Sequence, residues 1–295
     1  MPVRKSRFRP VPAIVLGLVG MLLLASCASG DTDGIPDGEP DLSVINASFE
    51  TLAGDDVRIP FGLVDADNVP RTGADVEVYL RTLEGEVRSG PHEAEFHSTD
   101  DTGTPTGVYV ASIASADPGT HEVVVVDGDE WGMAAVQIVD ADDSQAPAPG
   151  DDAISVETPT FDDDLGIEQI STLREPTTMH ETSLDEVLEQ GRPAMVLFAT
   201  PAYCQTAVCG PAVESLEDVH LSRDWGDVEF LHLEIFTDDG QTVAPWVEEW
   251  NLPTEPWLFA VDSDGVIVDR MDGTLIPSEM QALAERLAED GPDEI

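Results

Sequence analysis

The sequence predicts an all-β part followed by an α/β part, both behind a removable N-terminal leader. Three observations predict this organisation. Between residues 42 and 140, apolar and polar residues alternate in several short segments, which is typical of half-buried strands. From residue 161 to residue 289 the pattern changes to helices alternating with strands. The first residues are basic, then apolar, and this leader ends at Cys27.

Residues 1–26 have the features of a lipoprotein signal peptide. Four basic residues precede an apolar run from Val11 to Leu24, which is shorter than the ~20 residues of a membrane-spanning helix. The following Leu24-Ala25-Ser26-Cys27 resembles a bacterial lipobox and implies cleavage before Cys27 and its acylation, palmitate included. We therefore expect a lipoprotein on the extracytoplasmic face of the cell membrane, bound to it only through this lipid. The alternative is an uncleaved signal anchor.

The charge and the cysteine count restrict the partners. The formal net charge is −47, and such a surface repels nucleic-acid phosphates, so we expect no nucleic-acid partner. The chain has three cysteines. With Cys27 acylated, Cys204 and Cys209 remain, five positions apart. Such a pair in an oxidising compartment is a disulfide or a redox couple.

Residues 27–41 are rich in Gly, Asp, Pro and Ser and are predicted to be a flexible tether. Strands are expected in the all-β part, residues 42–140, around 57–63, 76–80, 109–113, 123–126 and 133–139. At the level of fold, this part resembles the immunoglobulin-like (Ig-like) modules of bacterial surface proteins, which implies a β-sandwich. Residues 141–160 form an acidic Pro-, Ala- and Gly-rich linker.

The α/β part, residues 161–289, precedes an acidic tail, residues 290–295. The pattern Ser183-Leu184-Asp185-Glu186 predicts a capping box and a short helix. The continuous apolar run 193–199 predicts a buried central strand. Helices are then expected over 208–222, 242–250 and 277–289, and strands over 228–236, 257–261 and 266–270. The predicted order is α-β-α-β-α-β-β-α.

This order, with a cysteine pair after the first strand, resembles the thioredoxin superfamily. Three stretches carry the resemblance: 195–204 is a strand, a short loop and a Cys; 204–211 leads into a helix; and 252–259 precedes a strand. The resemblance implies a thiol–disulfide oxidoreductase that acts on protein thiols and disulfides. Its site residues would be Cys204, Cys209 and Pro256, the last as a cis-proline facing the cysteines. We expect Cys204 to attack and Cys209 to resolve. The alternative is a monothiol site on Cys209, because Cys209-Gly210-Pro211-Ala212 mimics a C-G-P-C motif without its second Cys. No cofactor and no metal is implied.

The chemistry of the pair constrains its backbone. A thiolate attacks, and the positive end of a helix favours the thiolate form of a Cys placed there. Two residues five apart in one ideal helix would point ~140° away from each other, too far for easy bridging. A disulfide between Cys204 and Cys209 therefore requires Cys204 to lie in non-helical backbone before the helix.

The chain also departs from the superfamily pattern. The spacing is C-x4-C rather than C-x-x-C, and Tyr203 replaces the preceding Trp. The usual buried acid corresponds to Leu197, and the usual strand lysine corresponds to His232. The customary proton shuttle is thus missing unless His232 replaces it; the other interpretation is a core histidine. The Trp246, Trp250 and Trp257 cluster is either core or an apolar rim for substrate.

Three other functions remain open. The first is a thiol peroxidase, because Thr200-Pro201 and Cys209-Gly210 resemble single-chain peroxiredoxins. In those proteins a Thr lies three residues before the attacking Cys, and an activating Arg lies near the late strand. Here the first of these positions is Pro201, and residues 252–259 contain no Arg. A copper-handling protein like the Sco group would need a late His, and none follows His232. The third is a non-catalytic binding module, in which the disulfide is structural and the β-sandwich contacts a partner.

The lipid anchor is testable in a bacterial host. We expect Cys27→Ser to abolish incorporation of labelled palmitate and to move the protein out of the membrane fraction, because stable anchoring needs the acyl chains. Cys204→Ser is the matched control and should keep label and location. Membrane association of Cys27→Ser without label would show that the leader remains as a signal anchor.

Overall fold

The computed structural model describes residues 34–98, 104, 106–167, 169–173, 177–204 and 208–289. The predicted leader, Cys27 and the acidic tail, 290–295, lie outside these residues. Across the ranges just given, no helix has both the length and the apolar character needed to cross a membrane.

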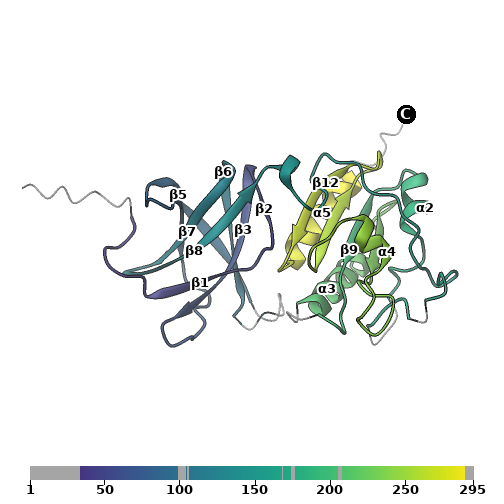
Figure 1. The fold of residues 1–295 in the computed structure, drawn as a ribbon, viewed down its shortest axis with the longest axis horizontal. Coiled ribbons are helices and arrows are strands. Elements are labelled where there is room, and N and C mark those ends of the chain that lie inside the picture. The colour runs from purple at the N-terminus through teal and green to yellow at the C-terminus, as the bar shows by residue number, and fades with distance from the viewer. Residues whose placement is uncertain are drawn as a thin grey trace, which may run out of the picture. The chain divides into compact units, whose positions relative to one another are not determined.

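The described residues of the β-rich part form eight strands. Figure 1 draws this part in purple to teal. The strands are β1 (Leu42–Asn46), β2 (Thr51–Leu52), β3 (Gly54–Asp65), β4 (Glu77–Thr82), β5 (Val87–His97), β6 (Val108–Ala116), β7 (Gly119–Asp127) and β8 (Glu130–Val139). Their order in the sheet is β1-β3-β6-β5-β4-β7-β8-β2, and β1 also pairs with β8. Strand β1 pairs with β3 in the antiparallel direction and with β8 in the parallel direction. Because β1 pairs with both, all the strands except β2 close into a barrel-like ring of seven.

This hydrogen bonding differs from the two separate sheets that a sandwich would show. The five predicted strand segments fall on β3, β4, β6, β7 and β8, and their inward apolar residues form one core that includes Leu63, Val78, Ala111, Val125 and Ile138. The sequence did not indicate β1, β2 or β5. In β5, exposed and half-exposed residues alternate and none is buried, so a clear apolar face is missing.

The α/β part has the predicted order of elements. It contains α2 (Leu184–Glu189), β9 (Ala194–Phe198), α3 (Cys209–Leu221), β10 (Glu229–Leu233), α4 (Pro245–Glu249), β11 (Trp257–Val261), β12 (Ile267–Asp272) and α5 (Pro277–Glu289). The sheet order is β10-β9-β11-β12. Strand β9 is parallel to β10 and antiparallel to β11, which places it in the interior of the sheet.

Strand β9 is buried on both faces, as its unbroken apolar sequence predicted. Met195 and Leu197 pack with residues of α3 and α5 in one core. Val196 and Phe198 pack on the opposite face with residues of α2 and α4. This second core also contains Trp246, Trp250 and Trp257, which are 2%, 0% and 0% exposed, so these tryptophans are core residues and not a rim.

The predicted linker, 141–160, is packed along much of its length. After a 3-10 turn at Ala141–Asp143, the Arg270 guanidinium donates to the Ala146 and Pro147 carbonyls at 2.9 and 2.8 Å. The Trp250 indole N–H donates to the Ile154 carbonyl at 3.0 Å. These contacts hold the segment against the four-stranded sheet.

The start of α2 also depends on this segment. The predicted capping box is not formed: Ser183 makes no capping hydrogen bond with its side chain. Instead, the Thr158 hydroxyl accepts a hydrogen bond from the Leu184 N–H at 2.9 Å, and the Ser183 hydroxyl accepts one from the Thr158 N–H at 2.8 Å. A residue distant in sequence therefore satisfies the first helical N–H group.

We expect Thr158→Val to lower the free energy of unfolding by about 1 kcal/mol, because the buried Leu184 N–H loses its acceptor. Urea unfolding followed by circular dichroism measures this change. The matched control is Thr120→Val on β7, where an exposed hydroxyl bonds Gln137; it should change stability by less than about 0.5 kcal/mol. Equal effects of the two substitutions would contradict the assigned role of Thr158.

Candidate functional site

The cysteine pair lies at the junction between a loop and α3. Cys204 and Cys209 form a disulfide, and their Cα atoms are 6.1 Å apart. Cys204 is in non-helical backbone after the turn at 201–203, whereas Cys209 is the first residue of α3. This is the arrangement that the spacing required.

The two sulfur-bearing residues differ in exposure. Cys209 is 0% exposed and belongs to the core between α3, α5 and the sheet. Cys204 is half-buried and packs at the edge of the same core. A thiol arriving from solvent therefore reaches Cys204 before Cys209, and the sulfur released from the protein disulfide would be that of Cys209.

Strand pairing brings Pro256 to the same edge of the sheet as Cys204. Strand β11 runs antiparallel to β9, with Trp257 opposite Phe198, so the start of β11 lies beside the end of β9. The loop after β9 carries Cys204, and Pro256 immediately precedes β11. The Glu255–Pro256 peptide bond is cis, as the resemblance implied.

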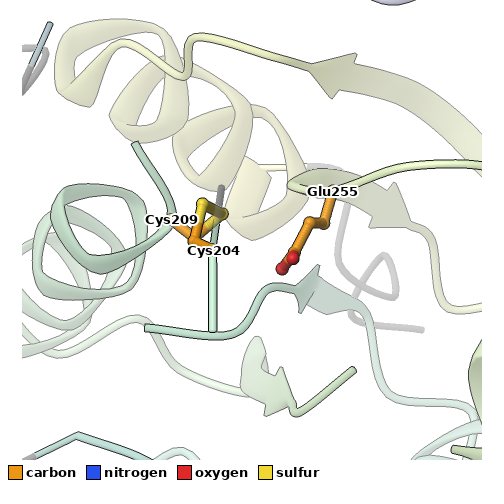
Figure 2. A group of neighbouring side chains, drawn as sticks. All are labelled: Cys204, Cys209 and Glu255. Carbon is orange, nitrogen blue, oxygen red and sulfur yellow. A yellow bond between two sulfur atoms is a disulfide. The ribbon is translucent and has the colours of Figure 1, made fainter. Parts of the chain in front are cut away.

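The same geometry places Glu255 beside the disulfide. Its side chain extends from the segment before β11 toward the loop of Cys204 (Figure 2). One carboxylate oxygen and the two sulfurs all lie within 4.8 Å of one another. The Thr200 N–H donates to Oε2 of Glu255 at 2.8 Å, which fixes the orientation of the carboxyl group.

The surroundings raise the pKa of Glu255 from 4.5 to about 7. Burial is the main cause, and the negative charge of Glu234 adds to it, whereas the hydrogen bond from Thr200 acts in the opposite direction. The group thus exchanges a proton near neutral pH, unlike an ordinary glutamic acid.

Two buried histidines support the end of β9. The His232 ring is 0% exposed; its Nε2–H donates to the Ala199 carbonyl at 3.0 Å, so its Nδ1 accepts from the His180 Nε2–H at 3.3 Å. Burial lowers the pKa of both rings, that of His180 to about 3. His232 is therefore a neutral core histidine whose two ring nitrogens are both occupied.

Two buried oxygens near this edge lack a hydrogen-bond partner within the part of the chain that the structure describes. They are Oε2 of Glu234 and Oγ1 of Thr200. The other oxygen of Glu234, Oε1, accepts from the N–H and the hydroxyl of Thr172. Unsatisfied buried polar atoms are costly and are often found where chemistry takes place.

Glu255 is one of the residues that line a groove of about 350 Å³. Most of its lining is apolar and comes from the segments after β10 and before β11, including Ile235, Phe236, Val243, Leu252 and Pro253. Apolar grooves of this size are typical of sites that take up an apolar group.

Cys204, Cys209 and Glu255 are also the three residues whose ligand atoms are close enough to hold a metal ion, within the described ranges. Thiolates would be needed as ligands, and in the disulfide the sulfurs are bonded to each other. The arrangement as it stands suits thiol–disulfide exchange.

Sequence reasoning identified the two cysteines and Pro256 but assigned no role to Glu255, Glu234 or Thr200. Glu255 lies within the stretch 252–259 that carried the resemblance. Its position directly before Pro256, which the resemblance predicts to face the sulfurs, was the signal that could have identified it.

Solved structures similar to this chain fall into two groups. A thiol:disulfide interchange protein of the thioredoxin family from Chlorobium tepidum TLS is 12% identical, covers 47% of this chain and 99% of its own, and has a TM-score of 0.31. The Lin-41 filamin domain is 14% identical, with 35% and 97% coverage and a TM-score of 0.23. The M1 domain from titin is 13% identical, with 35% and 94% coverage and a TM-score of 0.20.

No protein-family model matches the chain, and no curated protein matches it.

The difference in exposure predicts a difference in alkylation. In the folded, reduced protein with Cys27→Ser, we expect iodoacetamide to modify Cys204 about tenfold faster than Cys209, because Cys209 is buried. Peptide mapping by mass spectrometry measures both rates. The denatured protein is the control and should show nearly equal rates. Equal rates in the folded state would contradict the assigned exposure.

Proposed function

We propose that this protein is a membrane-anchored, extracytoplasmic thiol–disulfide oxidoreductase that acts on protein thiols and disulfides through the Cys204/Cys209 couple. One observation carries the proposal: the disulfide joins a half-buried Cys204 in a loop to a fully buried Cys209 at the first position of α3. A more accessible sulfur for attack and a protected sulfur for resolution suit exchange with a large partner.

The finer assignments belong to the same proposal. Residues 161–289 form the thioredoxin-like domain, residues 42–140 form an Ig-like module, and residues 27–41 form the tether to the membrane. Acylated Cys27 provides the anchor. The order of elements in the α/β part, the strand-rich 42–140 region and the lipobox-like sequence support these assignments.

The exchange would proceed in two steps. A substrate thiolate attacks Sγ of Cys204, the Cys204–Cys209 bond breaks, and its electron pair stays on Cys209. A second substrate thiolate then attacks the substrate sulfur of the mixed disulfide and releases Cys204. The substrate dithiol becomes a disulfide, and the protein holds two thiols. The reverse sequence reduces a substrate disulfide.

The complete burial of Cys209 also favours a second candidate, a non-catalytic binding module with a structural disulfide. The potential of the couple separates the two functions. Structural disulfides in secreted proteins have potentials below about −300 mV, whereas catalytic ones are more oxidising.

The attacking role of Cys204 is testable with insulin as substrate. In a Cys27→Ser background, we expect the protein to accelerate the reduction of insulin by dithiothreitol, and Cys204→Ser to return the rate to the uncatalysed level. Cys209→Ala should accumulate mixed disulfides through Cys204, visible on non-reducing gels, because the resolving thiol is missing.

Unchanged turnover in Cys204→Ser would remove the proposal. Peroxide consumption with a sulfenic acid on Cys204, in place of insulin reduction, would instead identify a thiol peroxidase.

A further inference from the structure

We propose that Glu255 is the catalytic acid and base of the Cys204/Cys209 couple: it gives a proton to the Cys209 sulfur when the disulfide opens and takes that proton back when the disulfide closes. The inference rests on the proposed function and deepens it by assigning the proton transfer.

The need for such a group follows from the burial of Cys209. When the disulfide opens, the electron pair of the broken bond remains on a sulfur that is 0% exposed and packed in an apolar core. A buried thiolate without a partner is unfavourable, and solvent does not reach it to supply a proton. The proton must come from a neighbouring group.

Glu255 is the titratable side chain in position. Its carboxylate oxygen lies within 4.8 Å of both sulfurs, a separation that one water or a small rotation of the side chain bridges. Because the Thr200 N–H holds Oε2, Oε1 is the oxygen available to carry the proton. Leu197 stands where the superfamily resemblance places a buried acid, so that position offers no acid.

The electrostatic surroundings favour a carboxyl group that gains and loses a proton easily. Glu234 acts from the end of β10 and disfavours the charged form of Glu255, and burial acts in the same direction. Thr200, after β9, stabilises the charged form. Behind Glu234, His232 and His180 are neutral, because burial lowers the pKa of both. Cys209 is the first residue of α3, and the positive end of the helix limits the cost of a transient charge on its sulfur.

The proton balance is complete with a substrate dithiol as the reductant. A substrate thiolate bonds to Sγ of Cys204, the S–S bond breaks, and the Cys209 sulfur takes the electron pair. The Glu255 carboxylic acid transfers its proton to that sulfur and becomes a carboxylate. In the reverse direction, the carboxylate removes the proton from the Cys209 thiol, which attacks Sγ of Cys204 and expels the substrate thiolate.

The test compares the full chain with Cys27→Ser, with and without Glu255→Gln. Glutamine keeps an oxygen acceptor for the Thr200 N–H but cannot transfer the proton. The readout is the rate at which dithiothreitol opens the Cys204–Cys209 disulfide between about pH 5 and about pH 9, by acid quench and mass spectrometry. Glu255→Asp tests rescue by a shorter acid. Glu249→Gln, at an exposed position on α4, is the matched control for loss of one charge.

We expect Glu255→Gln to slow opening about 100-fold below about pH 7 and to lose the inflection in the pH–rate profile near pH 7. The Asp variant should recover part of the rate, and Glu249→Gln should match the parent. The folded parent holds the Glu255 proton more tightly than its unfolded chain does. The parent should therefore lose stability as the pH rises from about 4.5 to about 7, and Glu255→Gln should lose less.

Failure of this inference is distinct from failure of the proposed function. A parent protein that opens its disulfide and turns over insulin, with a Glu255→Gln variant of identical rate and pH profile, would overturn the role of Glu255 alone. A parent that exchanges with no thiol at any pH would overturn the proposed function itself. A uniform loss of rate at every pH, with the inflection retained, would show that Glu255 only supports the loop.

Discussion

The antiparallel pairing of β11 with β9 is the constraint on which the site depends. Because β9 ends where β11 begins, the loop that carries Cys204 and the segment Glu255–Pro256 meet at one edge of the sheet. The hydrogen bond from the Thr200 N–H to Glu255 joins the two segments directly. If β11 had been parallel to β9, Glu255 would lie a strand length away from the disulfide.

Burial gives the two cysteines different chemical roles. The sequence places Cys209 at the start of a helix whose inner face packs on the sheet, so its sulfur is enclosed by core residues. Cys204 lies in a loop and is only half-buried at the edge of that core. Because of this difference, a substrate thiolate attacks Cys204 from the solvent side, and the leaving sulfur of Cys209 stays in the core. The same enclosure creates the requirement for a local proton source, because the released sulfur is shielded from water.

Burial also affects the acidic residues in a way that composition alone would not suggest. The formal net charge of −47 shows that the chain carries many carboxylates. Glu255 stands apart because burial and the charge of Glu234 raise its pKa to about 7. The chain therefore holds one carboxyl group with a pKa of about 7 close to the two sulfurs.

The order of helices and strands in the α/β part was readable from the sequence, as were the disulfide and the cis peptide before Pro256, because apolar periodicity, the cysteine spacing and the resemblance are local signals. Only the tertiary structure decided that Thr158, rather than the capping box, satisfies the first N–H group of α2. It also decided that His232 is a buried histidine hydrogen-bonded to His180, and that eight strands of the described residues join in one sheet. It also decided that Glu255 meets the disulfide. The physical reason is the same in each case. These contacts join residues far apart in the chain, and they arise from strand pairing and burial. Neither produces a recognisable pattern in the sequence immediately around each residue.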